Sequence, residues 1–217
     1  MYNTPDSIRE LVNALAELPS IGPRQATRLA FYLIGRGAQN TESLIRGLEA
    51  LKKIKICERC FFPTLGSGPR PPAGVGVIND SVNKTLCEIC SDKSRDPSVI
   101  MIVEKETDLI SIENTGKFRG RYLVLGTIPK TGMLEEAQKL RLQNLKRFIE
   151  KELKGKAKEI ILGFNPTNIG DFNATLIEQE LKPLTEKLSR LGRGLPTGGE
   201  VEFADDETLG SAIKGRN

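Results

Sequence analysis

The sequence predicts an α/β protein built from several parts. Three observations lead to this fold class. Apolar residues recur with a helical period before residue 56, all four cysteines lie between residues 57 and 90, and apolar strand-like runs alternate with helical stretches after residue 98. We therefore expect a helical region at 1–56, a cysteine-centred segment at 57–90, a parallel α/β domain at 98–193, and a C-terminal strand and helix at 194–217.

Composition limits the classes of protein to consider. The 217 residues contain no apolar run of eighteen, so we expect no membrane-spanning helix, and the N-terminus shows no secretory signal. The net charge of +4 and the pI near 8.9 are compatible with nucleic-acid binding without being diagnostic of it. Cysteines in two close pairs without a signal indicate a reducing cytoplasm.

The N-terminal region predicts three helices. The first starts at Thr4-Pro5 and ends at Pro19, and the second starts at Pro23. A third is expected at 42–55. The apolar face of the first helix is predicted to be Ile8, Leu11, Val12, Leu15 and Leu18. That of the second is predicted to be Ala26, Leu29, Ala30 and Leu33, and that of the third Leu44, Ile45, Leu48 and Leu51.

The turn between the first two helices carries a candidate binding site. Gly22 lies just before the second helix, where backbone N–H groups lack partners and the helix dipole favours an anion. Arg24 and Arg28, four residues apart, share one face beside it. These features are suited to a DNA phosphate. The stretch 18–26 resembles a helix-hairpin-helix, although that motif usually has glycine where this chain has Ser20. An ordinary helical hairpin with solvated arginines is the alternative.

The cysteines form two C-x-x-C pairs, Cys57 with Cys60 and Cys87 with Cys90. This spacing predicts four thiolates around one structural zinc ion per chain. Two redox-active or unpaired thiol pairs are the alternative interpretation. The loop between the pairs, 61–86, is rich in Gly and Pro and predicts no regular structure.

The C-terminal half alternates predicted strands and helices. Strands are expected at 99–103, 122–125 and 159–164, and helices at 107–114, 134–153 and 171–188. The alternation predicts a parallel sheet with right-handed crossovers. The long helix is expected to bury Ala137, Leu140, Leu145, Phe148 and Ile149. A Gly-rich loop from Arg193 then leads to a short strand and a last helix at 207–214.

Glu104 follows the first strand of this half, and Asp171 follows a later one. Two carboxylates at strand ends could hold magnesium. Their order resembles a Toprim domain, whose enzymes place a pair of acidic residues at the later position. Here Ile169 stands where the first acid of that pair would be, so we predict a degenerate site and no enzymatic activity. A magnesium-dependent nuclease or primase-like enzyme is the alternative. For Glu104, capping the next helix or pairing with Arg119 or Arg121 is an equal possibility.

Taken in order, the motifs are similar to those of the RecR family of bacterial recombination mediators. The resemblance covers nearly the whole chain and includes the four cysteines, Asn165-Pro166-Thr167 and Arg193-Gly194-Leu195-Pro196. It departs at Ser20, at Ile169 and in the expanded loop 61–86.

The resemblance implies a non-enzymatic protein of recombinational DNA repair. Such proteins act with RecO and RecF to load RecA at gaps, and they bind single- and double-stranded DNA without sequence specificity as homodimers or ring-shaped homotetramers. It implies a cytoplasmic, nucleoid-associated protein. Arg24 and Arg28, beside Gly22, match DNA-contacting positions, and Glu104 matches a residue linked to partner binding. Cys57, Cys60, Cys87 and Cys90 match the zinc ligands. A zinc-containing interaction module with a purely structural hairpin is a further alternative.

Overall fold

The structure, a computed structural model, describes residues 4–65, 85–129 and 133–216, except for the side chains of residues 38–40. The chain divides into two compact units, residues 1–54 and residues 55–217. We describe each unit by itself. In the described residues, no helix is both long enough and apolar enough to cross a membrane.

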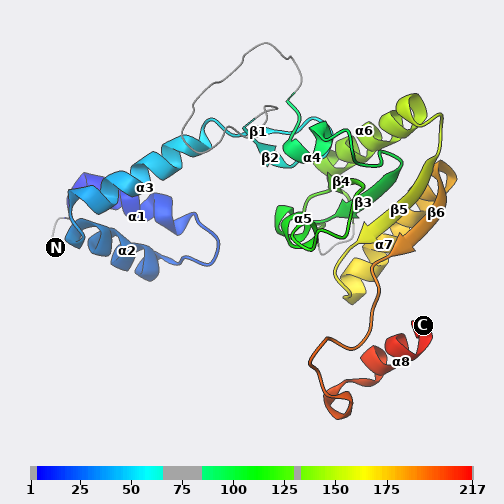
Figure 1. The fold of residues 1–217 in the computed structure, drawn as a ribbon. Helices are drawn as coiled ribbons and strands as arrows, with labels where there is room; N and C mark the ends of the chain where they lie inside the picture. The colour runs from blue at the N-terminus through cyan, green and yellow to red at the C-terminus, as the bar shows by residue number, and fades with distance from the viewer. Residues whose placement is uncertain (1–3, 66–84, 130–132, 217) are drawn as a thin grey trace. The chain divides into compact units, whose positions relative to one another are not determined.

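The first unit consists of three helices, α1 (Asp6–Ala16), α2 (Pro23–Gly35) and α3 (Ala38–Leu51) (Figure 1). The predicted inner face of α2 is confirmed, because Ala26 and Ala30 are fully buried. The small alanine side chains allow α1 to pack closely against α2. Pro23 is the first residue of α2, where its missing N–H costs no helical hydrogen bond.

The prediction for the third helix is wrong in two respects. The helix was expected at 42–55, but α3 begins at Ala38 and ends at Leu51, and its apolar face is not buried. Four apolar side chains of α3 that were expected to face inward are 43–62% exposed, namely Leu44, Ile45, Leu48 and Leu51. A bundle of three short helices has too little surface to cover every apolar face. The α3 helix therefore presents an apolar stripe that the described part of this chain does not bury.

The second unit is organised around a four-stranded sheet (Figure 1). Its strands are β3 (Val99–Val103), β4 (Arg121–Val124), β5 (Ala157–Gly163) and β6 (Thr185–Arg190), in the order β4-β3-β5-β6. Every pairing is parallel, and Met101 lies opposite both Tyr122 and Ile161. The prediction of a parallel sheet is confirmed.

Each face of the sheet carries its own core. On one face, Ile100, Ile102 and Leu123 pack with residues of α6 (Glu136–Glu152) and α7 (Asn168–Leu181). On the other face, Met101 and Val103 pack with α5 (Glu106–Glu113) and with the four cysteines. The alternation follows from the two-residue period of a strand, which sends successive side chains to opposite faces.

Two details of the C-terminal helices differ from expectation. The helix predicted at 171–188 ends at Leu181, and its remainder forms a 3₁₀ turn, η1 (Lys182–Leu184), followed by β6. Pro183 explains the break, since proline lacks the N–H that a helix interior needs. In α6, Ala137 and Leu140 are exposed, whereas Leu142 is buried with Leu145 and Ile149. The buried residues recur at three- and four-residue intervals, and the extra apolar residues lie outside that stripe.

The remaining elements are short. β1 (Lys55–Ile56) pairs antiparallel with β2 (Pro63–Thr64), and α4 (Glu88–Ser91) contains the last cysteine. Most of the predicted loop 61–86 lies outside the described residues. The predicted last helix is confirmed as α8 (Asp206–Lys214), but the strand expected before it is a 3₁₀ turn, η2 (Val201–Phe203). None of the described strands pairs with this segment, so its backbone groups need other partners. The Phe203 amide donates to the Glu200 carbonyl and closes the turn.

Candidate functional site

The four cysteines meet in one cluster. Their sulfur atoms all lie within 4.8 Å of one another, and all four residues are buried. The sulfurs of Cys60 and Cys87 lie 3.4 Å apart. Two backbone amides donate to the sulfurs: that of Cys87 to Cys57 at 3.3 Å and that of Cys90 to Cys87 at 3.4 Å. The expectation that both pairs face one point is confirmed.

This arrangement fits a zinc ion. With Zn–S bonds of about 2.3 Å, a tetrahedral site has sulfurs about 3.8 Å apart, between the closest and the widest separations of the cluster. Metal binding requires the thiolate form of each cysteine, and a cation at the centre of the cluster stabilises that form. Four thiolates leave no open position, so a zinc held here would be structural.

The cluster is built onto the sheet. The Val124 amide on edge strand β4 donates to the Cys60 carbonyl at 2.8 Å. Arg95, which follows the last cysteine and is 8% exposed, forms an ion pair and hydrogen bonds with Glu113 on α5. Its guanidinium also donates to the Gly120 carbonyl at 3.3 Å. The cysteine segment and the sheet are therefore one packed body.

The candidate anion site lies at the N-terminus of α2. Gly22 is its N-cap, with extended backbone, and its carbonyl accepts from the Ala26 amide at 2.9 Å. A Cβ atom at Gly22 would meet nothing within 4 Å, so the space beside it is open. Arg24 and Arg28 are both exposed, one turn apart, and neither forms an ion pair within the described residues.

Ser20 shows why this motif usually has a glycine. Its φ angle is +66°, in the left-handed region that glycine enters without steric cost. The Ile21 amide donates to the Leu18 carbonyl at 3.1 Å and closes the turn around it. The hairpin geometry is thus reached despite the substitution.

Glu104 lies at the carboxyl end of β3 and is 8% exposed. Burial and then repulsion from Asp108 raise its pKa, and Lys105 acts weakly in the opposite direction. Lys105 is the N-cap of α5, and its amide donates to the Asp108 carboxylate at 3.0 Å, so Glu104 is not the capping residue. It forms no ion pair with Arg119 or Arg121. Both structural roles considered for Glu104 are therefore wrong.

Asp171 lies in the first turn of α7, not in the loop before it. Arg193 binds its carboxylate through two nitrogens, and Arg190 binds it at 3.2 Å. Hydrogen bonding to Arg193 lowers the pKa of Asp171. Asp171 lines a cavity of about 290 Å³ that Glu104 does not line. Among the described residues, the cysteines are the one group of three or more potential metal ligands.

The sequence reasoning missed the role of these two arginines. Arg190 was expected to lie beyond a long helix and Arg193 to start a loop, yet β6 brings both beside Asp171. The available signal was Pro183, which ends the helix and allows the chain to return along the sheet. Both oxygens of the Asp171 carboxylate are engaged by these two guanidiniums.

Comparisons with known proteins find three matching regions in the chain. Family models described as "RecR, helix-hairpin-helix", "Toprim domain" and "RecR, C-terminal" match residues 8–52, 98–192 and 194–217. The chain is 38% identical over 212 residues to a protein of Chloroflexus aurantiacus named "Recombination protein RecR", covering 96% of this chain and 93% of that protein. Proteins of the same name from Rubrobacter xylanophilus and Paenarthrobacter aurescens are 37% and 35% identical, each over 97% of this chain and 96% of the relative.

Proposed function

The chain belongs to the RecR family of recombination proteins, and we propose that it acts as a DNA-binding mediator without enzymatic activity. In this proposal it works with RecO- and RecF-type proteins to load a RecA-type recombinase at gaps, in the cytoplasm where the nucleoid lies. The observation that carries the DNA-binding part is the N-terminus of α2, with an open glycine cap and two exposed arginines.

The proposed contact is to phosphate and not to bases. The first amides of a helix point outward and carry the positive end of its dipole, so they bind an anion without reading sequence. Arg24 and Arg28 add two charges with no acidic partner in the described residues to compete with a phosphate. The open space at Gly22 lets a phosphate approach the backbone closely.

Binding to a labelled duplex and a labelled single strand, measured by fluorescence anisotropy across a salt series, tests this proposal. At 0.1 M salt each phosphate contact contributes about 0.9 log units of affinity, so an Arg24→Ala, Arg28→Ala variant should bind roughly 60-fold more weakly. An Arg46→Ala, Lys52→Ala variant, which loses the same charge from exposed positions of the same unit, is the matched control. Equal loss in both variants, or no loss in the first, would refute the assignment.

We also propose a ring-like homo-oligomer, either a dimer or a tetramer. Support comes from exposed apolar side chains near both ends of the chain. The first unit exposes 54% of Phe31, 57% of Leu48 and 62% of Leu51, and the C-terminal segment exposes 80% of Phe203 and 62% of Ile213. Two separate self-complementary surfaces on one chain can close a ring. Light scattering of Leu48→Glu and Phe203→Glu variants should give a smaller mass than the wild type, a dimer where the wild type is a tetramer or a monomer where it is a dimer, and an unchanged mass in both would contradict the proposal.

Zinc is proposed as a structural ion, one per chain, held by the four cysteines. Its contribution would be folding energy, because thiolates this close repel one another without a cation between them. Elemental analysis should find about one zinc per chain. Four freely titrating thiols in a stably folded protein would contradict this assignment.

The alternative of a magnesium-dependent Toprim enzyme has less support. Asp171 is engaged by two arginines, and Ile169 offers no oxygen. Magnesium needs several oxygen ligands from protein, water or phosphate, and a carboxylate neutralised by arginine is a poor one. Nuclease and primer-synthesis assays with magnesium and manganese should show no turnover. Turnover that Glu104→Gln abolishes would establish the enzyme instead.

For Glu104 we propose a role in binding a partner protein of the RecO or RecF type. A buried carboxylate with a raised pKa carries an energetic cost that packing alone does not explain. Its exposed neighbour Lys105 would provide the contact surface. Capture of purified RecO and RecF by wild-type and Glu104→Gln proteins tests this role, with DNA binding as the internal control.

A further inference from the structure

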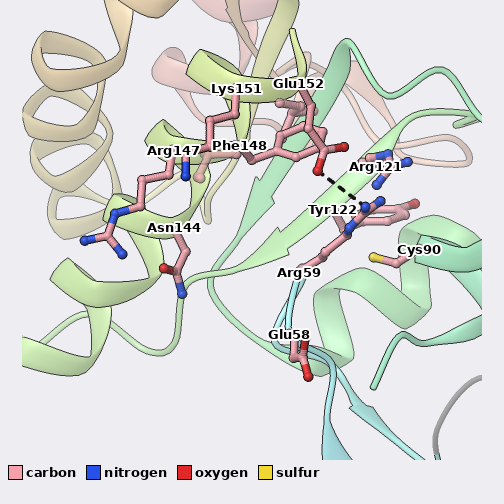
Figure 2. A pocket seen from close by; sticks show the side chains of 12 residues that line it. Glu58, Arg59, Cys90, Arg121, Tyr122, Asn144, Arg147, Phe148, Lys151 and Glu152 are labelled. Carbon is pink, nitrogen blue, oxygen red and sulfur yellow. Dashed lines mark ion pairs between the residues drawn. The ribbon is translucent and has the colours of Figure 1, made fainter. Parts of the chain in front are cut away.

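The second unit contains a cationic cavity that the proposed function does not use. The cavity has a volume of about 420 Å³ and lies where the first cysteine knuckle, β4 and α6 meet. Figure 2 shows Arg59 and Arg121 close to the ring of Phe148, with Arg147 and Lys151 along the helix. Four cations and two carboxylates, Glu58 and Glu152, line the cavity. The cations gather around Phe148, and this local concentration of positive side chains makes the cavity a candidate anion site.

Arg121 provides the first reason to expect a ligand. Two of its nitrogens, Nε and Nη1, are buried and have no hydrogen-bond partner within the described residues. Arg121 also forms no ion pair in this part of the chain, and its guanidinium lies 5.4 Å from the Phe148 ring centre. Unsatisfied buried donors on a charged group are costly, so such groups usually have a partner. Cys90 also lines the cavity. With zinc bound, the negative zinc–thiolate cluster would stabilise the positive charge of Arg121, but it would not occupy the cavity.

Arg59 provides the second reason. Its guanidinium lies 5.8 Å from the same ring, so two cations share one aromatic side chain. The acid that pairs with Arg59 is Glu152, at 3.5 Å and 54% exposed. A bound anion between the two guanidiniums would relieve their repulsion.

We propose that this cavity binds a nucleoside 5′-phosphate, either as a free nucleotide or as the terminal nucleotide of a DNA strand. Arginine forks match phosphate oxygens, and flat bases stack on aromatic rings and guanidinium planes. Phe148, Arg59 and Arg121 offer both elements within one cavity of a size suited to a small ligand. Nucleotide chemistry is favoured over an acidic peptide because the same wall combines the aromatic ring with two guanidiniums.

Calorimetric titration of the full zinc-loaded chain with dAMP, inorganic phosphate and deoxyadenosine tests the proposal. We expect saturable binding of one dAMP per chain, weaker binding of phosphate, and none of deoxyadenosine. A 5′-phosphorylated tetranucleotide and its unphosphorylated form distinguish the two sources. Binding of dAMP alone identifies a free nucleotide, whereas tighter binding of the phosphorylated tetranucleotide identifies a strand terminus.

Matched variants separate this site from the hairpin. Arg121→Gln should weaken dAMP binding at least tenfold, and Phe148→Leu should weaken it several-fold. If the Arg121→Gln variant loses its zinc, dAMP binding is judged instead from the Phe148→Leu variant and from Lys151→Ala, which changes an exposed residue. Lys139→Ala, on the same helix, is the control. The Arg24→Ala, Arg28→Ala variant should bind dAMP normally while losing affinity for DNA. No saturable binding of dAMP or tetranucleotide, binding unchanged in the variants, or preference for an acidic peptide would overturn the proposal.

Discussion

Replacing Ser20 by glycine should stabilise the first unit. Ser20 is held at φ +66°, where an L-residue loses about 1–2 kcal/mol relative to its right-handed conformation. Glycine avoids this cost but loses about 0.5–1 kcal/mol more backbone entropy on folding. The side chain is exposed, so its removal sacrifices no packing. The expected net gain is about 0.5–1 kcal/mol, or roughly 2–8 °C for a unit of this size.

Hydrogen exchange followed by mass spectrometry is the appropriate assay, because it reports α1 and α2 separately from the sheet. Ser20→Gly should slow exchange in both helices, Ser20→Asn should have a smaller effect in the same direction, and Ser20→Ala should give no gain. Lys154, exposed with φ +55°, is a matched site in the second unit. Lys154→Gly should protect α6 and β5 and leave α1 and α2 unchanged. Equal stability of the alanine and glycine variants at Ser20 would refute the reasoning.

Three further predictions concern the second unit. Glu113→Ala, which leaves the buried Arg95 without its main partner, should cost about 3–5 kcal/mol in urea unfolding, whereas the double variant Arg95→Met, Glu113→Leu should cost much less. An equal cost in both would contradict the ion-pair account. Because burial raises the pKa of Glu104, the folded state favours the protonated carboxyl. The contribution of Glu104 to stability is therefore complete below the ordinary glutamate pKa and is lost as pH rises through the folded-state pKa. The Glu104→Gln variant should therefore have a higher melting temperature than the wild type at pH 7, and the difference should disappear near pH 4. A lower melting temperature of the variant at pH 7 would contradict this account of Glu104. Removing zinc with a chelator should expose β4 and α5 to hydrogen exchange before α7, since the cysteines pack in the core that contains Leu109 and Val124. Uniform loss of protection across the unit would argue against a local role.

Much of the architecture could be predicted because its signals are local. The run Val99–Val103 is apolar throughout, as a strand buried on both faces must be, and its bounds are confirmed. The two C-x-x-C pairs also carry their own geometry, because each spacer directs two sulfurs to one point. In both cases the residues that make the structure are neighbours in the sequence.

The errors arise where the outcome depends on distant parts of the molecule. Leu48 and Leu51 have the period of a core-facing helix, yet they are exposed because the described part of the first unit has no surface that covers them. The period of an apolar stripe identifies a face that will be buried but does not identify the partner that buries it. Exposure of these leucines is therefore informative, and it is the main structural support for the proposed oligomer.

Asp171 connects three segments of the second unit that are distant in the sequence. In this chain its carboxylate joins α7 to Arg190 at the end of β6 and to Arg193 at the start of the C-terminal segment. The two guanidiniums balance the charge of the Asp171 carboxylate. This pairing stabilises the fold and fixes where the C-terminal segment begins.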